Sequence, residues 1–240
     1  MSDVTPTRRR EGGRPRRSGG QGLRQRPWRQ PANPYPPLQI LSADEIEAIH
    51  ETSLRVLEEL GIEVMSGTAR ELLASHGAEV DASSGVVRLD RALVMQMLQK
   101  VPSTFTLVPR NVERRLEIGG SHLAFGLVAG PPNVHDCERG RRAGNYRDYC
   151  DFIRLAQFFN VIHLIGNQVC APMELPANSR HLDTYLANLL WSDMPFHCSS
   201  IGAGRALDAI RMAAIARGTT PEGLVEHPAV MSIINVNSPR

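Results

Sequence analysis

Hydrophobic and polar positions follow two different periods along the chain, and after about residue 130 these periods alternate regularly. Short apolar runs typical of strands are separated by longer segments whose apolar residues recur at helical spacing. Alternating units of this kind predict a parallel sheet covered by helices. The pattern predicts strands at 133–137, 161–168, 196–201 and 229–236, and helices at 146–159, 180–191 and 205–217.

Residues 38–118 lack this alternation and predict a small α+β region. Ser42 followed by Glu45 has the spacing of a capping box, and Gly61 is the expected end of that helix. The remaining pattern predicts a short strand at 62–65, a helix at 68–75, a hairpin at 78–89, a helix at 90–100 and a strand at 104–108.

Residues 1–37 are rich in Arg, Gly, Pro, Gln and Ser, and they predict a disordered tail because they cannot bury enough apolar area. Residues 1–30 carry nine Arg against Asp3 and Glu11, while the other 210 residues carry 18 basic and 23 acidic side chains. A solvated leader is therefore favoured over an anion-binding patch, and we expect no specific nucleic-acid partner.

The four cysteines form no C-x-x-C pair and match no zinc spacing, which favours reduced thiols and a cytoplasmic location. No run of about 18 apolar residues exists, and no apolar stretch follows the N-terminal arginines. We therefore expect neither membrane association nor secretion.

The predicted strands carry polar side chains near their carboxyl ends, where barrel enzymes place their active sites. A dinucleotide fold is disfavoured because Gly140 and Gly144 do not fit G-x-G-x-x-G. The expected fold class is α/β: an incomplete (β/α)₈ (TIM-type) barrel of about four βα units at 119–240, preceded by the α+β region at 38–118. No helix pattern follows the last strand, so an open strand edge is expected.

Substrate-binding candidates are polar groups expected at this end of the barrel. For Arg141 and Arg142, in a loop, the alternative to substrate binding is an exposed surface role. For Asn235 and Asn237 the alternative is an ordinary turn after the last strand. Mid-strand His163 is expected to be a hydrogen-bonded core histidine. Several His and Cys side chains could approach the same end, but their spacing forms no motif, so no metal site is predicted. The candidates are Asn167, Gln168, His197, Ser199, Asn235, Asn237, Arg141 and Arg142.

Several stretches together resemble the trimethylamine methyltransferase family, the corrinoid methyltransferases of methylamines and glycine betaine. They are LSADEIEAIHETSLRVLEELGIEV at 41–64, TLVPR at 106–110, the Arg-rich turn at 140–142, the helix at 148–155 and NVNSP at 235–239. The resemblance runs in order from about residue 38 to residue 240 and covers the N-terminal half of the family pattern.

The resemblance implies a (β/α)₈ barrel that binds a methylated amine or quaternary ammonium compound and transfers a methyl group to a separate corrinoid protein. It implies no cofactor bound directly to this chain. No catalytic residue can be carried over, because the second half of the family pattern has no counterpart here. Aromatic side chains that could hold a quaternary ammonium group are scarce, the candidates being Phe125, Trp191 and Phe196.

Two alternatives to an active methyltransferase follow from the expected open edge. The chain could be a non-catalytic half-barrel that pairs with a second polypeptide carrying the missing half, or with a second copy of itself. It could also be a truncated remnant without a stable fold.

Overall fold

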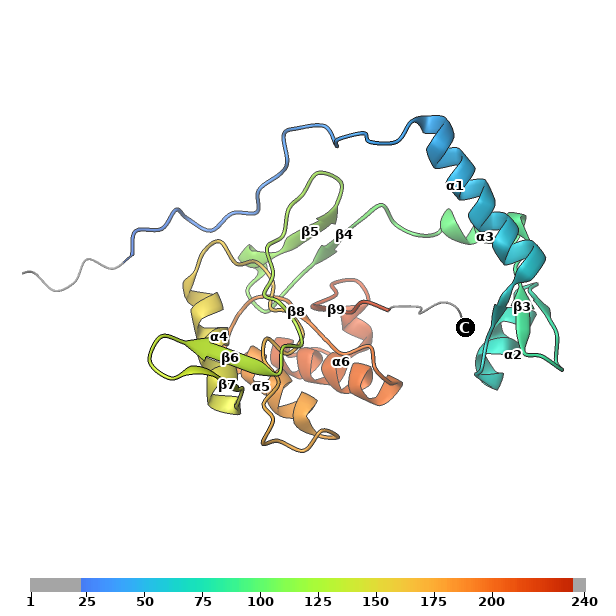
Figure 1. Ribbon diagram of the computed structural model, residues 1–240. Coiled ribbons are helices and arrows are strands. Elements are labelled where there is room, and N and C mark those ends of the chain that lie inside the picture. Colours follow the sequence, from blue (N-terminus) through green and yellow to red (C-terminus); the bar gives the residue numbers. More distant parts are fainter. Residues whose placement is uncertain (1–22, 235–240) are drawn as a thin grey trace, which may run out of the picture.

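The computed structural model describes residues 23–234, which form a mixed α/β structure with six α-helices and several small sheets (Figure 1). Two parts can be told apart in Figure 1: an N-terminal lobe, residues 43–101, and a body, residues 104–234. Residues 23–42 run beside the body and then cross to the lobe.

The lobe begins with the predicted capping box. The Ser42 side chain accepts a hydrogen bond from the Glu45 amide at 3.2 Å, and the Glu45 carboxylate accepts one from the Ser42 amide at 2.8 Å. The helix passes through one π-helical turn and ends at Gly61, whose φ of 74° suits glycine. The first helical elements are α1 (Ala43–Arg55) and η1 (Val56–Leu60).

Three short antiparallel strands, in the order β1-β3-β2, join two further helices in the lobe. Its buried apolar side chains are Leu54, Ala78 and Val87, and a cavity of about 530 Å³ lined by apolar side chains and His76 lies beside α2 and α3. The bounds are β1 (Ile62–Glu63), α2 (Gly67–Ser75), β2 (Glu79–Val80), β3 (Val86–Arg88) and α3 (Arg91–Leu98).

Two antiparallel hairpins open the body, and the second corrects a prediction. Residues 133–137 were expected to start a parallel sheet, but they pair antiparallel with the segment that follows them. The reason is local: the Asp136 carboxylate accepts hydrogen bonds from the amides of Glu138 and Arg139 and turns the chain back. The elements are β4 (Thr104–Leu107), η2 (Val112–Arg114), β5 (Leu116–Gly119), β6 (Asn133–Asp136) and β7 (Gly140–Ala143).

Parallel pairing is nevertheless present between four segments that lie side by side in chain order. Gly126 bridges to Leu164, and Ile165 bridges to Phe196. The fourth segment is β9 (Val230–Met231), which pairs in parallel with β8 (Phe196–His197). The first parallel segment, at Gly126, therefore precedes residue 133, where the sequence analysis placed the first strand of the sheet. The described residues do not form a closed barrel.

Three helices cover one face of these parallel segments. Ile165 and Phe196 point into the core beneath the helices, where Tyr149 and Tyr185 are also fully or almost fully buried. These helical elements are α4 (Tyr146–Phe158), α5 (Arg180–Trp191), α6 (Ala203–Arg217) and η3 (Glu222–Leu224).

Part of the predicted disordered tail has a defined course. Residues 23–33, called the strap from here on, contact the body through several hydrogen bonds and an isolated bridge between Ala32 and His122. Residues 1–22 lie outside the described range.

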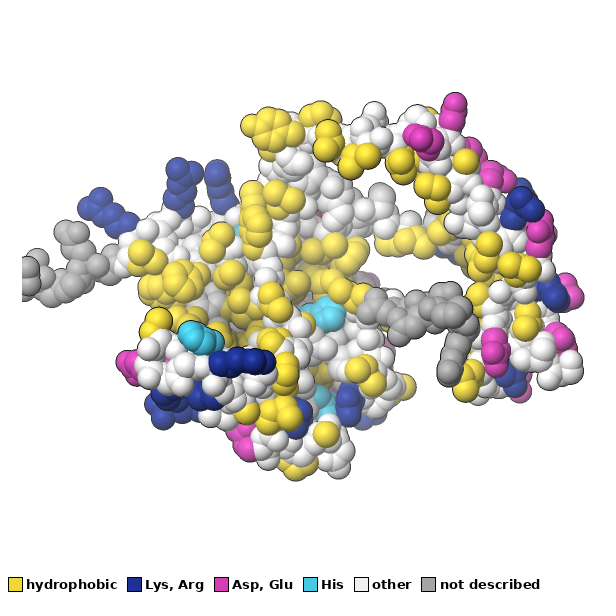
Figure 2. All heavy atoms as spheres, in the orientation of Figure 1, with side chains coloured by type: hydrophobic (Ala, Val, Ile, Leu, Met, Phe, Trp, Pro, Cys, Tyr) yellow, Lys and Arg dark blue, Asp and Glu magenta, His cyan; other side chains and the backbone are white. Residues whose placement is uncertain are grey.

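Figure 2 shows Asp and Glu side chains along the outer side of the lobe and hydrophobic side chains gathered over the viewer's face of the body. Within residues 23–234, none of the helices has the length and apolar character needed to cross a bilayer.

Candidate functional site at the carboxyl ends of the parallel segments

The parallel segments present one face that the helices leave uncovered. Ile165 and Phe196 point into the core, so alternation along the strands directs Leu164 and His197 to the opposite face. Met231 is the register partner of His197 and shares that side. These three partly exposed side chains define what we call the open face.

His197 is the sequence-predicted candidate placed on the open face. Its amide donates to the Ile165 carbonyl at 2.8 Å, which fixes the backbone. Its Nε2 atom is buried and has no hydrogen-bond partner among the described residues. Burial lowers the pKa of His197 from its ordinary value, so the imidazole is neutral near pH 7 and is able to bind an uncharged or polar group.

Asn167 and Gln168 lie at the turn that ends the second parallel segment. Gln168 has a φ of 35°, uncommon for a residue with a side chain, and its carbonyl accepts a hydrogen bond from the Gly130 amide at 2.8 Å. The turn is thus tied to the end of the first parallel segment. Asn167 is half-buried, and its role in substrate binding stays a prediction.

Ser199 follows the third parallel segment and is already engaged with the protein. Its amide donates to the Tyr185 hydroxyl at 2.8 Å, and its own Oγ accepts from the Ile201 amide at 3.2 Å. These bonds hold the loop after β8 against α5. Ser199 is buried, so they favour an orienting role over direct contact with a ligand.

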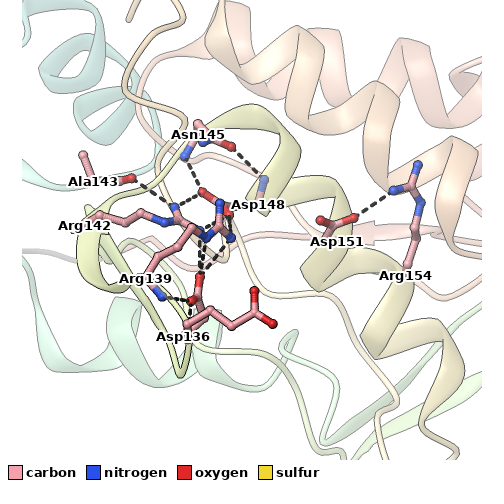
Figure 3. Close-up of polar contacts among 9 residues, drawn as sticks. Asp136, Arg139, Arg142, Ala143, Asn145, Asp148, Asp151 and Arg154 are labelled. Atoms are coloured by element: carbon pink, nitrogen blue, oxygen red, sulfur yellow. Dashed lines mark hydrogen bonds and ion pairs between the residues drawn. The ribbon is translucent and has the colours of Figure 1, made fainter.

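Arg142 lies at the centre of an ion-pair network between the β6–β7 hairpin and the start of α4 (Figure 3). Its guanidinium forms a two-pronged pair with the Asp148 carboxylate, with Nη2 to Oδ1 at 2.6 Å, and also reaches Asp136 Oδ2 at 3.1 Å. Asp148 completes a capping box with Asn145 at the first turn of α4. The contacts assign Arg142 a structural role at the base of the hairpin.

The ion pairs and hydrogen bonds of this network lower the pKa values of its two aspartates and raise that of its arginine. The Arg142 guanidinium holds the pKa of Asp148 below its usual value, and the paired carboxylates raise the pKa of Arg142. Hydrogen bonds, foremost from the Arg139 amide, lower the pKa of Asp136 to about 2. All three groups are therefore charged at neutral pH.

Arg141 differs from its neighbour in the network. It lies opposite His135 in the hairpin register, is exposed, and forms no ion pair within the described part of the chain. The hairpin base is joined to the loop after the second parallel segment, because the Ala171 amide donates to the Pro131 carbonyl at 2.9 Å. Arg141 thus belongs to the carboxyl-end side of the body. The two remaining candidates, Asn235 and Asn237, fall outside the described residues.

The aromatic candidates for a quaternary ammonium cage do not meet at this end. Phe196 is buried against the Tyr185 ring, and Arg154 lies over the Trp191 ring at 3.8 Å. Phe125 packs on His163 near the amino ends of the parallel segments. Between residues 23 and 234 no cage is assembled from these three side chains.

Metal ligands are likewise not gathered in the described range, where no cluster of three or more His, Cys, Asp or Glu side chains could hold an ion. Three of the cysteines are buried, and burial raises the pKa of Cys170 to about 11 and that of Cys198 above its ordinary value. The thiols of Cys170 and Cys198 therefore remain protonated near neutral pH and are poor ligands or nucleophiles.

The sequence interpretation did not recognise the Arg142 network. Its signal was present as Asn145 three residues before Asp148, the spacing of a capping box. His163 behaves as expected: it is 1% exposed and both ring nitrogens are within hydrogen-bond distance of a backbone partner. The carboxyl ends of the parallel segments therefore carry a neutral imidazole and amide groups, and the neighbouring hairpin carries the exposed Arg141; a shared role in ligand binding stays a prediction.

Comparison with known proteins relates this chain to one family of methyltransferases. Residues 7–240 match the family described as Trimethylamine methyltransferase (MTTB). The chain is 33% identical over 204 residues to a glycine betaine methyltransferase of Desulfitobacterium hafniense (strain Y51), covering 85% of this chain and 42% of that relative.

Two further relatives match over shorter stretches. A proline betaine:corrinoid methyltransferase of Eubacterium limosum is 30% identical over 127 residues, 53% of this chain and 26% of the relative. The trimethylamine methyltransferase MttB of Methanosarcina barkeri (strain Fusaro / DSM 804) is 38% identical over 74 residues, 31% of this chain and 15% of the relative.

The matched regions thus cover between 15% and 42% of the length of these relatives. The family match nevertheless covers both the lobe and the body, including all four parallel segments. The chain belongs to the trimethylamine methyltransferase family, a family of corrinoid-dependent methyltransferases of methylamines and betaines.

Proposed function

We propose that this chain forms the N-terminal part of a (β/α)₈-barrel methyltransferase that moves a methyl group from a methylated amine or betaine to the corrinoid of a separate protein. The observation that carries the proposal is the parallel order of four successive segments, covered by helices on one face, in a chain of this family. Successive parallel strands with covering helices are the construction principle of such barrels.

The open face would be the inner wall of that barrel. His197 would contact the substrate there through the exposed part of its ring, and Asn167 would orient it from the neighbouring strand end. The exposed guanidinium of Arg141 suits the carboxylate of a betaine, because it has no acidic partner within the described residues. The corrinoid of the partner protein supplies the nucleophile that accepts the methyl group.

Positioning is the contribution that these residues make. A neutral imidazole and amides add no cation beside a positively charged substrate, so they avoid the repulsion that a protonated histidine would cause. The low pKa of His197 preserves this neutral form near pH 7. Holding the methyl group in line with the nucleophile is how such a site would accelerate transfer.

The test is methyl transfer by the purified chain to Co(I)-cobalamin or a corrinoid protein, followed by absorbance, with glycine betaine, proline betaine and trimethylamine as donors. We expect methylcobalamin with at least one donor and a loss of roughly tenfold or more in rate for His197→Gln. His76→Gln, an exposed change on the lobe, is the matched control and should leave the rate unchanged. A folded sample that turns over none of the donors contradicts the proposal for this chain alone.

A second candidate function is assembly without catalysis, in which the chain pairs with another polypeptide through β9. One observation favours it: within the described residues β9 pairs with β8 alone, and a cavity of about 310 Å³ lined mainly by apolar side chains lies beside β9 and α6. A strand with one unpaired edge and apolar surroundings favours pairing with another strand. Light scattering across a concentration series tests this, and a monomer at all concentrations with cooperative unfolding contradicts it.

A further inference from the structure

The strap, residues 23–33, is fastened to the body mainly by hydrogen bonds. The Gln25 side chain accepts from the Asn160 amide at 2.8 Å and donates to the Phe158 carbonyl at 2.9 Å. The Gln30 side chain makes the same kind of double contact with the backbone of Glu117, at 2.9 and 2.8 Å. Each glutamine side chain therefore pairs with one backbone amide and one backbone carbonyl of the body, Gln25 at residues 158–160 and Gln30 at residue 117.

His163 joins the strap to the second parallel segment. Its Nδ1 accepts from the Phe125 amide at 3.0 Å, so Nε2 must carry the proton and donate to the Arg29 carbonyl at 3.0 Å. One ring thus connects the strap, the first parallel segment and the second. Because the imidazole is 1% exposed, both bonds are shielded from water.

Trp28 covers His163 from the strap side. The two rings meet edge to face with centroids 5.7 Å apart, and Arg114 lies 6.0 Å from the centre of the indole ring. The strap does not pack tightly elsewhere, since a cavity of about 370 Å³ remains between it and the body, lined in part by Pro27 and Val161. A segment held by polar bonds and one aromatic contact can open without unfolding the core.

The strap lies at the opposite end of the parallel segments from the candidate site. His163 begins the stretch that continues through Ile165 to Asn167, and four residues of strand span about 13 Å. Backbone hydrogen bonds hold the middle of this stretch on both sides: the Leu127 amide donates to the Leu164 carbonyl at 3.2 Å, and the Ile165 amide donates to the Pro195 carbonyl at 3.1 Å. The His163 ring adds two side-chain bonds at the beginning of this stretch, so we expect the order of the strand end to respond when that beginning is released.

We propose that the strap, fastened by His163, is a positioning element that fixes the second parallel segment and, through it, the turn at Asn167 and Gln168. When the strap detaches, this segment loses its anchor at one end and the turn at the other end loosens. An effect of this loosening on substrate binding rests on the proposed function, whereas the positioning of the turn does not.

Amide hydrogen exchange measured by mass spectrometry tests the proposal on the whole chain. His163→Leu removes both ring bonds, and we expect exchange to rise about tenfold or more at the amides of Glu117 and Asn160, which donate to the strap. The decisive reporter is the Gly130 amide, which donates to Gln168 at the far end and should also exchange faster. The Cys198 amide, bonded to Met231, is the internal control and should not change.

Two further variants separate positioning from general damage. Trp28→Ala alters the strap and leaves the strands untouched, so it should give the same pattern even if His163→Leu fails to fold. His163→Gln retains a polar group near the Nε2 position and should restore protection in part.

Unchanged exchange at Gly130 while Glu117 and Asn160 exchange faster would overturn the positioning role, as would an equal rise at Cys198. Because no turnover is needed, this outcome is independent of whether the chain transfers methyl groups.

Discussion

Gly166 packs directly against the backbone of the first parallel segment, and replacing it with alanine tests the pairing of the two segments. A Cβ at this buried position would lie well inside van der Waals contact with the Leu127 carbonyl oxygen and 2.9 Å from its carbon. Relief requires the segments to part by on the order of 1 Å. That shift would lengthen the bond from the Leu127 amide to the Leu164 carbonyl, now 3.2 Å, beyond bonding range.

The expected cost has two parts. Overpacking a buried site costs about 1–3 kcal/mol, and losing one backbone hydrogen bond costs about 1 kcal/mol more. Gly166→Ala should therefore lower the free energy of unfolding by about 2–4 kcal/mol, and Tm by roughly 5–15 °C for a chain of this size. Urea unfolding followed by far-UV circular dichroism measures the change, and heating gives the second value.

Gly126→Ala is the matched control on the partner segment. Its Cβ would lie 3.5 Å from the Leu164 carbonyl oxygen, an ordinary contact, at an exposed position. We expect a change of less than about 1 kcal/mol, in the stabilising direction if the loss of unfolded-chain freedom dominates. If Gly166→Ala is as stable as Gly126→Ala, the close approach of the two segments is wrong.

Three other outcomes follow from the structure. Because the pKa of Asp148 lies below its ordinary value, its contribution to stability is complete above about pH 4 and is lost as pH falls further. In urea unfolding, Arg142→Gln should lose less free energy of unfolding on acidification than the unchanged chain. An equal loss in both would contradict the ion pair. Tyr149→Phe leaves the buried Asn188 oxygen without its 2.8 Å partner and should cost about 1–3 kcal/mol in the same assay, so unchanged stability would count against this bond. Cys137 is the exposed thiol, so one equivalent of a thiol reagent should react in the native state and four in urea, and faster labelling of a second thiol would refute the burial pattern.

The helices were the most predictable part of this fold, because each carries a local signal. Ser42 with Glu45 marks the start of α1, and Gly218 in the left-handed conformation marks the end of α6. The apolar stripe of the helix predicted at 146–159 matches α4, whose Tyr149 and Ile153 are fully buried. Such features depend on neighbours within one or two turns, so the sequence alone contains them.

The parallel segments were harder to predict, because each pairs over only one or two residues and its partner lies far along the chain. The segment around Gly126 carries glycines and reads as a loop, while residues 133–136 read as a strand and prove to be half of a hairpin. A two-residue ladder gives the sequence little room to show a period. The Asx-type turn at Asp136 was the local clue that the chain reverses.

The candidate site was predictable in part. The positions of Asn167, His197 and Ser199 at strand ends follow from the alternation of elements, and the structure places them there. The engagement of Arg142 with Asp148 depends on how the hairpin folds against α4, which no single segment encodes. The contacts of the strap are also long-range, since Gln25 bonds to a residue more than 130 positions away.

The uncovered side of the parallel segments can serve as its own reporter. Leu164, His197 and Met231 are partly open to water, so hydroxyl radicals reach their side chains without unfolding. Any molecule or polypeptide that seats against this wall must shield them together. Footprinting these side chains would therefore detect a binder of unknown identity and show, from which ones become protected, how much of the wall it occupies.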